Sequence, residues 1–179
     1  MSFPRYETPT GKIILEYLHG KFGDAIKMDP LKASVFYHDD RKAALPEMKK
    51  MIENNDFVIL DRYKYSNFAH QPAKIEDENK RLEILRKLQN MEKDLPEADL
   101  VILLSVPPEI SQKMLDKEKN KDMHESDIEF IKRTNEVYEF LCKENKNWIK
   151  IDCIKDGKLM SIEEIHKRIY ESVKEFFNL

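Results

Sequence analysis

The sequence predicts an α/β domain built on a parallel sheet. Three apolar runs have the length of strands: FVIL at 57–60, LVILLSV at 100–106 and WIKI at 148–151. Helical patterns lie between these runs, and strands that alternate with helices are typical of this fold class. The first two runs are continuous rather than alternating, as expected for strands that are covered on both faces.

The helices are predicted from their start signals and from apolar spacing. Asp29 and Pro30 form a good helix start, because proline is tolerated at the first helical position. Ser161 and Glu164 have the spacing of a capping box at the start of the last helix. Four segments carry apolar residues along one side: Leu31, Val35, Leu45, Met48 and Ile52; Leu82, Leu85, Leu88, Met91 and Leu95; Ile128, Ile131, Tyr138 and Leu141; and Ile165, Ile169, Val173 and Phe177.

Size and composition limit the function classes. At 179 residues the chain has the length of one domain, so we expect 1–179 to form a single domain. Charged residues make up 36% of the chain in mixed sign with a net charge of −3, which gives no electrostatic reason to bind nucleic acid or a membrane surface. No apolar run has the length of a membrane span, and the start MSFPRYETPTGK lacks the apolar core of a signal peptide. We therefore expect a cytoplasmic protein.

The two cysteines fit a reducing compartment. Cys142 falls on the apolar side of a helical pattern, and Cys153 follows a strand. We expect reduced, packed thiols, with a disulfide or a redox role as the weaker alternative.

Charged residues follow the first apolar run directly, in FVILDRY. In a parallel α/β sheet the ligand binds beyond the carboxyl ends of the strands, so Asp61 and Arg62 are candidate site residues. A carboxylate there can bind Mg²⁺ or accept a proton, and a guanidinium can hold phosphate through two parallel hydrogen bonds. The alternative is a salt bridge that fixes the end of the strand.

The helix after this strand favours a ligand site. Its polar residues fall on one side at three- and four-residue spacing, an unusual face to bury unless something polar is bound there. These residues are Ser66, Asn67, His70 and Gln71.

A second candidate group is VFYHDDR at 35–41. Tyr37 and Arg41 are four residues apart on a helix, so they are neighbours that can stack on a flat ring and hydrogen-bond its edge. The alternative is a core tyrosine beside a surface arginine. A metal site shared by residues 38–40 is disfavoured, because adjacent helical positions point in different directions.

The segment DKEKNKD at 116–122 is charged, has no apolar anchor and lies between two helices. It is either a solvated loop or a lid whose lysines reach a phosphate. The lysines are Lys117, Lys119 and Lys121.

Together these stretches resemble the thymidylate kinase family, whose members transfer the γ-phosphoryl group of ATP to dTMP. The resemblance includes SFPRY, EYLHGKFGD, VFYHDDR, LDRYKYSNFAHQ, the PPE after the 100–106 run and the IDC of the last strand. It covers nearly the whole chain, and D-R-Y-x-x-S-N-x-A-x-Q is its specific part. It implies a three-layer, P-loop-kinase-like fold, ATP and Mg²⁺ as cofactors, dTMP as substrate and a homodimer.

The resemblance assigns the phosphate-binding and metal-binding roles. Asp61 resembles the carboxylate at the Mg²⁺ and phosphoryl-transfer centre, and Arg62 resembles the arginine that holds the dTMP phosphate. The family pattern Phe-Pro-x-Arg places its arginine at Tyr6, while this chain carries Arg5 one residue earlier as a candidate for that role. The lid of this chain has lysines and no arginine, so it would offer point charges to ATP.

The resemblance also assigns the nucleoside pocket. Tyr37 takes the place of the aromatic residue that stacks on thymine, and Arg41 that of the arginine that reads its carbonyl edge. Phe3 matches a phenylalanine beside the base. His70 replaces an aromatic residue near the sugar, and His124 falls where many relatives carry a tyrosine near the substrate. The polar helix face that lines the pocket corresponds to Ser66, Asn67 and Gln71.

Transfer from ATP in this family requires the loop G-x-x-x-x-G-K-[ST] after a strand. The sequence does not contain it, since Gly11-Lys12 follows no strand and precedes Ile13. In the family the loop lies upstream of SFPRY, together with the central first strand. We therefore expect a fold that lacks this strand, through a misassigned start or a true truncation. The runs 57–60 and 100–106 would then pair directly or need another polypeptide between them.

Three functions are compatible with these residues. The leading one is a thymidylate kinase that acts by positioning and charge neutralisation. The second is a non-catalytic protein that binds dTMP alone. The third is a related deoxynucleoside kinase, which the D-R-Y and Phe-Pro stretches fit less well.

Overall fold

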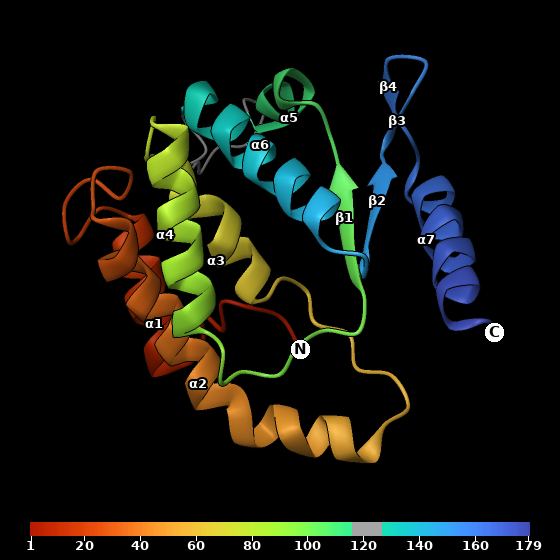
Figure 1. Cartoon of the computed structure of the whole chain (residues 1–179), viewed down its shortest axis with the longest axis horizontal. Helices are drawn as coiled ribbons and strands as arrows, with labels where there is room; N and C mark the ends of the chain where they lie inside the picture. The colour runs from red at the N-terminus through yellow and green to blue at the C-terminus, as the bar shows by residue number, and fades with distance from the viewer. Residues whose placement is uncertain (116–126) are drawn as a thin grey trace.

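The structure, a computed structural model, describes residues 1–115 and 127–179 and combines many helices with a small parallel sheet (Figure 1). The helices are α1 (Pro9–Leu18), α2 (Pro30–Asn54), α3 (Lys64–His70), α4 (Glu78–Met91), α5 (Pro108–Leu115), α6 (Ile128–Glu144) and α7 (Ile162–Phe177), with a 3-10 turn η1 (Pro72–Lys74). The strands are β1 (Val101–Ser105), β2 (Trp148–Asp152), β3 (Ile154–Lys155) and β4 (Lys158–Leu159).

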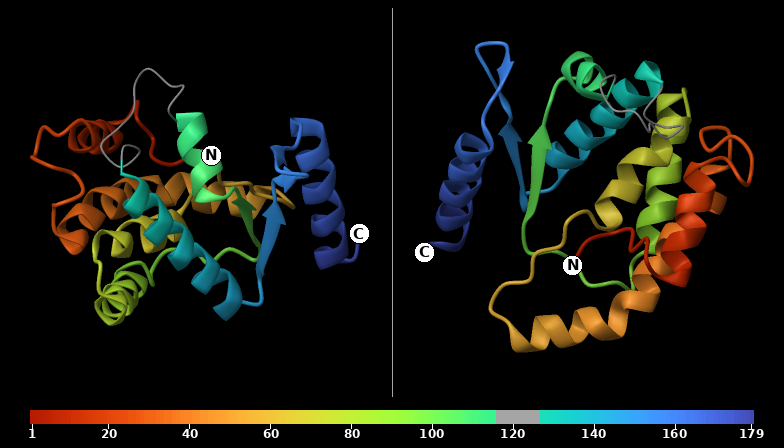
Figure 2. Two further views of the ribbon diagram at one scale, coloured as in Figure 1. Left: turned by 90° about the horizontal axis from the view of Figure 1, so that it is seen from above. Right: turned by 180° about the vertical axis from the view of Figure 1, so that it is seen from behind.

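The predicted runs 100–106 and 148–151 form the parallel pair β1 and β2, which confirms both strands. Val101 lies opposite Trp148, and Ser105 lies opposite Asp152. Helices α6 and α7 lie on opposite sides of the pair (Figure 2). β3 and β4 form a separate antiparallel hairpin.

The expectation that helices cover β1 on both faces is wrong. Val101 and Leu103 pack against the core cluster that α6 contributes to. Leu104 is 51% exposed. Because successive side chains of a strand point to opposite faces, Leu104 lies on the other face, where α7 contacts β2 but leaves Leu104 about half exposed.

The prediction of a strand at 57–60 is also wrong. Hydrogen bonds join the start of the chain to the end of this run: Asp61 N–H donates to Met1 O, and Phe3 N–H donates to Asp61 O, both at 2.9 Å. These contacts give only one isolated parallel bridge. The run does not pair directly with β1 either, and Ile59 is 82% exposed. A strand requires a ladder of backbone partners, and the described residues supply too few.

The helix starts are confirmed. Asp29 is the N-cap of α2: its side chain accepts a hydrogen bond from the Lys32 N–H, and Pro30 is the first helical residue. The helix continues through Pro46 without a break. Ser161 and Glu164 form both hydrogen bonds of the capping box at α7. None of the described helices has the length and apolar character needed to cross a membrane.

Gly11 lies inside α1, so Gly11-Lys12 belongs to a helix and not to a phosphate loop. A Cβ at this position would lie 1.9 Å from the carbonyl oxygen of Arg5. Gly11 therefore allows the chain around Arg5 to pass close to α1. The hydroxyl of Thr8 caps this helix by accepting from the Gly11 N–H at 3.1 Å.

The buried hydrophobic residues of the described chain form three clusters. One joins α3, α4, α6 and β2, with Phe68, Leu85, Leu88, Val137, Leu141 and Trp148. The second contains Phe3, Ala44, Met48, Tyr63 and Leu95, and the third contains Ile14, Tyr17 and Ala33. By contrast, α7 has no buried residue. Cys142 and Cys153 are both free thiols, and burial raises the pKa of each.

Candidate functional site

The polar side of α3 is the centre of the candidate site. Phe68 and Ala69, on one side of this short helix, pack into a core cluster. Asn67 and Gln71 are 4% and 1% exposed, yet Asn67 Oδ1 and Gln71 Oε1 have no hydrogen-bond partner in the described part of the chain. Buried polar atoms are nearly always paired in folded proteins, so two unpaired oxygens on one helix side indicate a place for a ligand.

A buried carboxylate, Glu92, links α3 to α2. Arg41 donates to it through Nε at 3.0 Å and also through Nη2. Asn67 donates to the same carboxylate from Nδ2 at 3.1 Å. His38 Nδ1 lies 3.5 Å from Glu92 Oε2. Arg41 is only 2% exposed, which rules out its interpretation as a surface charge.

Tyr37 lies one turn before Arg41 on α2 and points toward α1. Its ring meets the ring of Tyr17 edge to face, with the centroids 6.2 Å apart. Tyr37 is half-buried. The structure therefore keeps Tyr37 and Arg41 on neighbouring turns, as predicted, but gives each its own protein contacts.

Asp61 and Arg62 are both exposed, and no ion pair joins these two described side chains. Asp61 Oδ2 instead accepts a hydrogen bond from the Ser2 hydroxyl at 3.1 Å. Arg62 has a φ of 59°, in the left-handed region that few arginines adopt. Backbone of this kind often occurs at functional sites. The salt-bridge alternative is therefore wrong, and both charged groups remain available.

His70 and Ser66 form a second polar group with Tyr138 of α6. His70 Nδ1 lies 2.8 Å from the carbonyl oxygen of Ser66; since a carbonyl only accepts, Nδ1 carries the proton. Tyr138 donates to the Ser66 hydroxyl at 3.3 Å. Burial and the nearby charge of Arg62 lower the pKa of His70 to about 4, so the imidazole is neutral at pH 7. Burial raises the pKa of Tyr138.

Arg5 is held by α2. Its backbone N–H donates to Asp40 Oδ2 at 2.9 Å, and its Nε donates to Asp40 Oδ1 at 3.2 Å. Asp40 is 1% exposed and also accepts from Thr10 at 2.7 Å. Phe3 is 4% exposed and packs on Tyr63, with ring centroids 5.9 Å apart. Phe3 thus belongs to a core cluster, and Arg5 belongs to a buried polar network beside it.

The predicted lid at 116–122 lies outside the described residues. The same holds for four of the predicted site residues, Lys117, Lys119, Lys121 and His124.

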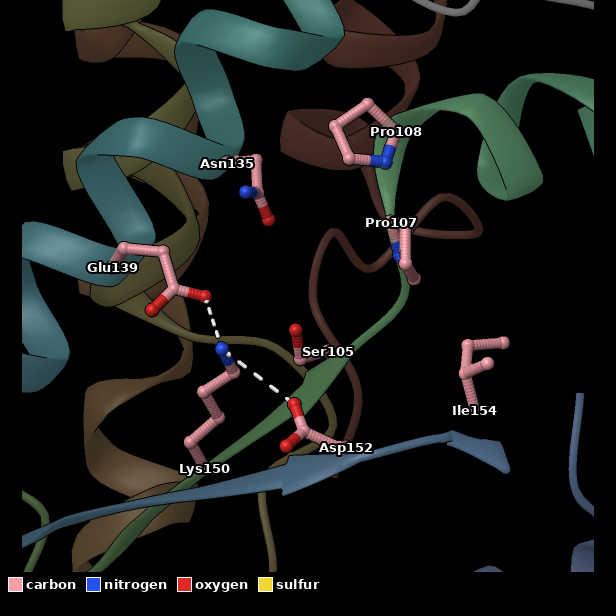
Figure 3. Close-up of a pocket in the computed structure, with 8 residues that line it drawn as sticks. All are labelled: Ser105, Pro107, Pro108, Asn135, Glu139, Lys150, Asp152 and Ile154. Carbon is pink, nitrogen blue, oxygen red and sulfur yellow. Dashed lines mark ion pairs between the residues drawn. The ribbon is translucent and has the colours of Figure 1, made fainter. Parts of the chain in front are cut away.

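A separate pocket of about 390 Å³ opens at the carboxyl ends of β1 and β2 (Figure 3). Ser105 and Asp152 lie at the ends of the two strands, and Glu139 comes from α6. Lys150 pairs with Glu139 at 2.6 Å and with Asp152 at 3.5 Å. The pocket is at the edge where α/β proteins bind ligands, but its one lysine is already neutralised.

Glu92, Asp40 and Tyr138 are site residues that the sequence interpretation missed. The burial of Glu92 could have been predicted, because Glu92 lies four residues after Leu88 and so continues the apolar stripe of α4. A charged residue on a stripe that continues to a buried Leu95 is expected to have a buried partner.

The comparisons with known proteins match this arrangement to one family. The model of the family described as thymidylate kinase matches residues 1–169. The chain belongs to the thymidylate kinase family. It is 30% identical over 147 residues to a thymidylate kinase of Mycobacterium tuberculosis, covering 77% of this chain and 68% of that protein. It is 29% identical over 165 residues to one of Francisella tularensis, covering 90% of this chain and 73% of that protein.

The fold agrees with this family. A solved thymidylate kinase from Candida albicans superposes with a TM-score of 0.79, covering 99% of this chain and 79% of the other. At 22% sequence identity, this likeness concerns the fold alone. The family resemblance predicted from SFPRY, LDRYKYSNFAHQ and the other stretches is thereby confirmed.

Proposed function

We propose that this chain binds dTMP beside α3 and is the phosphate acceptor side of a thymidylate kinase, which converts dTMP and ATP to dTDP and ADP. The observation that carries the proposal is the pair of buried, unpaired oxygens of Asn67 and Gln71. In a member of this family, a polar helix side with unsatisfied acceptors is suited to a nucleotide base and sugar.

The neighbouring side chains supply suitable groups for the rest of the substrate. Arg62 offers an exposed guanidinium for the phosphate at the start of α3. Tyr37 offers an aromatic face, and Arg41 offers the N–H groups that Glu92 does not use. The neutral His70 and the hydroxyl of Ser66 add hydrogen-bonding groups without charge.

Asp61 fits the role of a Mg²⁺ ligand. No group of three or more metal-binding side chains occurs in the described ranges. Mg²⁺ at nucleotide sites is usually held by one or two carboxylates together with substrate phosphates and waters, so one exposed carboxylate is adequate. Bound there with ATP, Mg²⁺ would neutralise the charge that develops during phosphoryl transfer. Asp61 would orient the ion, and Arg62 would hold the acceptor phosphate.

The proposed fold is larger than the observed two-stranded parallel sheet. In it, β1 and β2 belong to a larger three-layer, P-loop-kinase-like sheet within one domain. The proposal also includes a homodimer. Gel filtration with light scattering tests the dimer, and a monomeric mass at working concentration would remove this part.

Calorimetry of the full chain with dTMP and with ATP·Mg²⁺ tests the function. We expect saturable dTMP binding by this chain, and conversion of dTMP to dTDP with both nucleotides present once the glycine-rich loop that this sequence lacks is supplied. Binding of dTMP without any effect of ATP would favour the non-catalytic binding protein. Phosphorylation of thymidine but not of dTMP would favour a deoxynucleoside kinase.

A further inference from the structure

Glu92 is a charged residue in the interior for which the predicted site has no role. It lies at the C-terminal end of α4, where its backbone N–H bonds to Leu88 O at 3.1 Å, and it is 0% exposed. A buried carboxylate is costly to desolvate unless partners compensate it. Here the compensation comes from two side chains, Arg41 on α2 and Asn67 on α3.

The carboxylate determines which way the Asn67 amide points. An ionised carboxylate only accepts hydrogen bonds, so the Nδ2 group of Asn67 faces Glu92 at 3.1 Å. Oδ1 of Asn67 then points away from Glu92, and this oxygen is buried without a partner in the described structure. A rotated amide would place two oxygens against each other. Glu92 therefore fixes Asn67 Oδ1 as a hydrogen-bond acceptor that points away from the carboxylate.

The carboxylate also determines how Arg41 is presented. Its Nε and Nη2 groups both donate to Glu92, which fixes the plane of the guanidinium. Arginine has five N–H donors, so donors remain on Nη1 and Nη2. Arg41 thus becomes a fixed donor, and Asn67 a fixed acceptor, around the same carboxylate.

We propose that Glu92 is a positioning residue for base selection: it holds Arg41 and Asn67 as a donor and acceptor pair that accepts thymine and disfavours cytosine. This inference rests on the proposed function. Thymine presents a carbonyl next to a ring N–H, which complements one donor and one acceptor. Cytosine presents an amino group next to an unprotonated ring nitrogen, which reverses both.

The variant Glu92→Gln tests this role in the full chain. A carboxamide can donate as well as accept, so it no longer determines the orientation of the Asn67 amide. We expect the ratio of the dTMP and dCMP dissociation constants, measured by calorimetry on one preparation, to move toward unity by roughly tenfold. Because both ligands report on the same folded fraction, a loss of stability does not change this ratio.

Glu97→Gln is the matched control. Glu97 pairs with Lys64, which is 1% exposed, at 2.7 Å, so this change also removes a carboxylate from a buried cation. It lies outside the donor and acceptor pair, and its selectivity should equal that of the unmodified chain. A selectivity loss as large in Glu97→Gln as in Glu92→Gln would overturn the assigned role.

Two further outcomes separate the inference from the proposed function. If the unmodified chain binds no dTMP, the proposed function fails. If it prefers dTMP and Glu92→Gln keeps the same preference, only the role of Glu92 is overturned. Should Glu92→Gln not fold, Glu92→Asp keeps the buried charge but shortens its reach to Arg41 and Asn67. Unchanged selectivity in that variant would equally overturn the inference.

Discussion

At the scale of single residues, Arg62 combines an exposed guanidinium with a backbone that few arginines adopt. This left-handed φ lies in the short connection between Asp61 and the first residue of α3, Lys64. Together with the family membership, this geometry makes Arg62 the strongest candidate for the acceptor phosphate.

Arg62→Ala should weaken dTMP binding. Loss of a charge-assisted phosphate contact costs about 1.5–3 kcal/mol, which is roughly 10- to 150-fold in the dissociation constant. Arg81→Ala is the control, because Arg81 pairs with Glu136 at 3.2 Å and is assigned no role in the site. Calorimetry with dTMP measures both, and equal affinities for the two variants would remove Arg62 from the site.

His70 should make the stability of the protein depend on pH. Its pKa is lowered from 6.5 to about 4 in the folded state, mainly by desolvation. Between these values the unfolded chain binds the proton and the folded chain does not, so stability falls as the pH decreases from 6.5 to 4. The slope from this one group is at most about 1.4 kcal/mol per pH unit.

Urea unfolding at several pH values between 4 and 7 measures this dependence. We expect His70→Gln to show a shallower slope than the unmodified chain, since glutamine does not titrate. His166→Gln on α7, where the side chain is exposed, is the matched substitution. Identical slopes for all three proteins would contradict the assignment to His70.

At the scale of elements, neither the segment 57–61 nor helix α7 contains a buried residue. Phe57 contacts Phe177 edge to face, with centroids 5.7 Å apart, which is the aromatic link between them. Ile59 is 82% exposed, and α7 has no buried residue. By contrast, α3 and α4 supply buried residues to the first cluster and α2 supplies them to the second.

Substitutions in these two regions should differ in their cost. Ile59→Ser should change the free energy of unfolding by no more than about 0.5 kcal/mol, because the side chain is already exposed. Met48→Ala should cost about 2–5 kcal/mol, because Met48 is 0% exposed in the second cluster. Chemical denaturation compares them. A cost above about 1.5 kcal/mol for Ile59→Ser would show that this segment is covered in solution.

At the scale of the whole molecule, the candidate site is formed by elements that are far apart in the sequence. Arg41 on α2 and Asn67 on α3 meet at Glu92 of α4, and Tyr138 of α6 reaches Ser66. A ligand that completes these contacts binds the folded chain and has no comparable site on the unfolded chain.

Binding of dTMP should therefore raise the melting temperature. At a free concentration of 100 times the dissociation constant, the stabilisation is about 2.7 kcal/mol, or a shift of roughly 5–11 °C for a domain of this size. Differential scanning calorimetry measures the shift, with dCMP at the same concentration as the control. A shift that is equal for both nucleotides would contradict selective binding of thymine.

Local signals were sufficient for much of this protein. Helix starts such as Asp29-Pro30 and Ser161 to Glu164 depend on neighbours within a few residues, and both were correct. The polar side of α3 follows from helical spacing alone. The runs at 100–106 and 148–151 became strands because each supplies the other with a parallel partner.

Tertiary contacts decided the remainder. FVIL has strand-like side chains, but backbone partners determine whether a strand forms. Among the described residues, those at the start of the chain make the one bridge at its end. From the sequence alone, Arg41 could be a surface charge. Its burial depends on an ion pair with Glu92, which is 51 residues away in the chain. From the sequence alone, Arg5 is a candidate phosphate ligand. In the structure it is bound by Asp40, which is 35 residues away in the chain. Spacing patterns report neighbours along one element, whereas burial and ion pairing depend on which elements pack together.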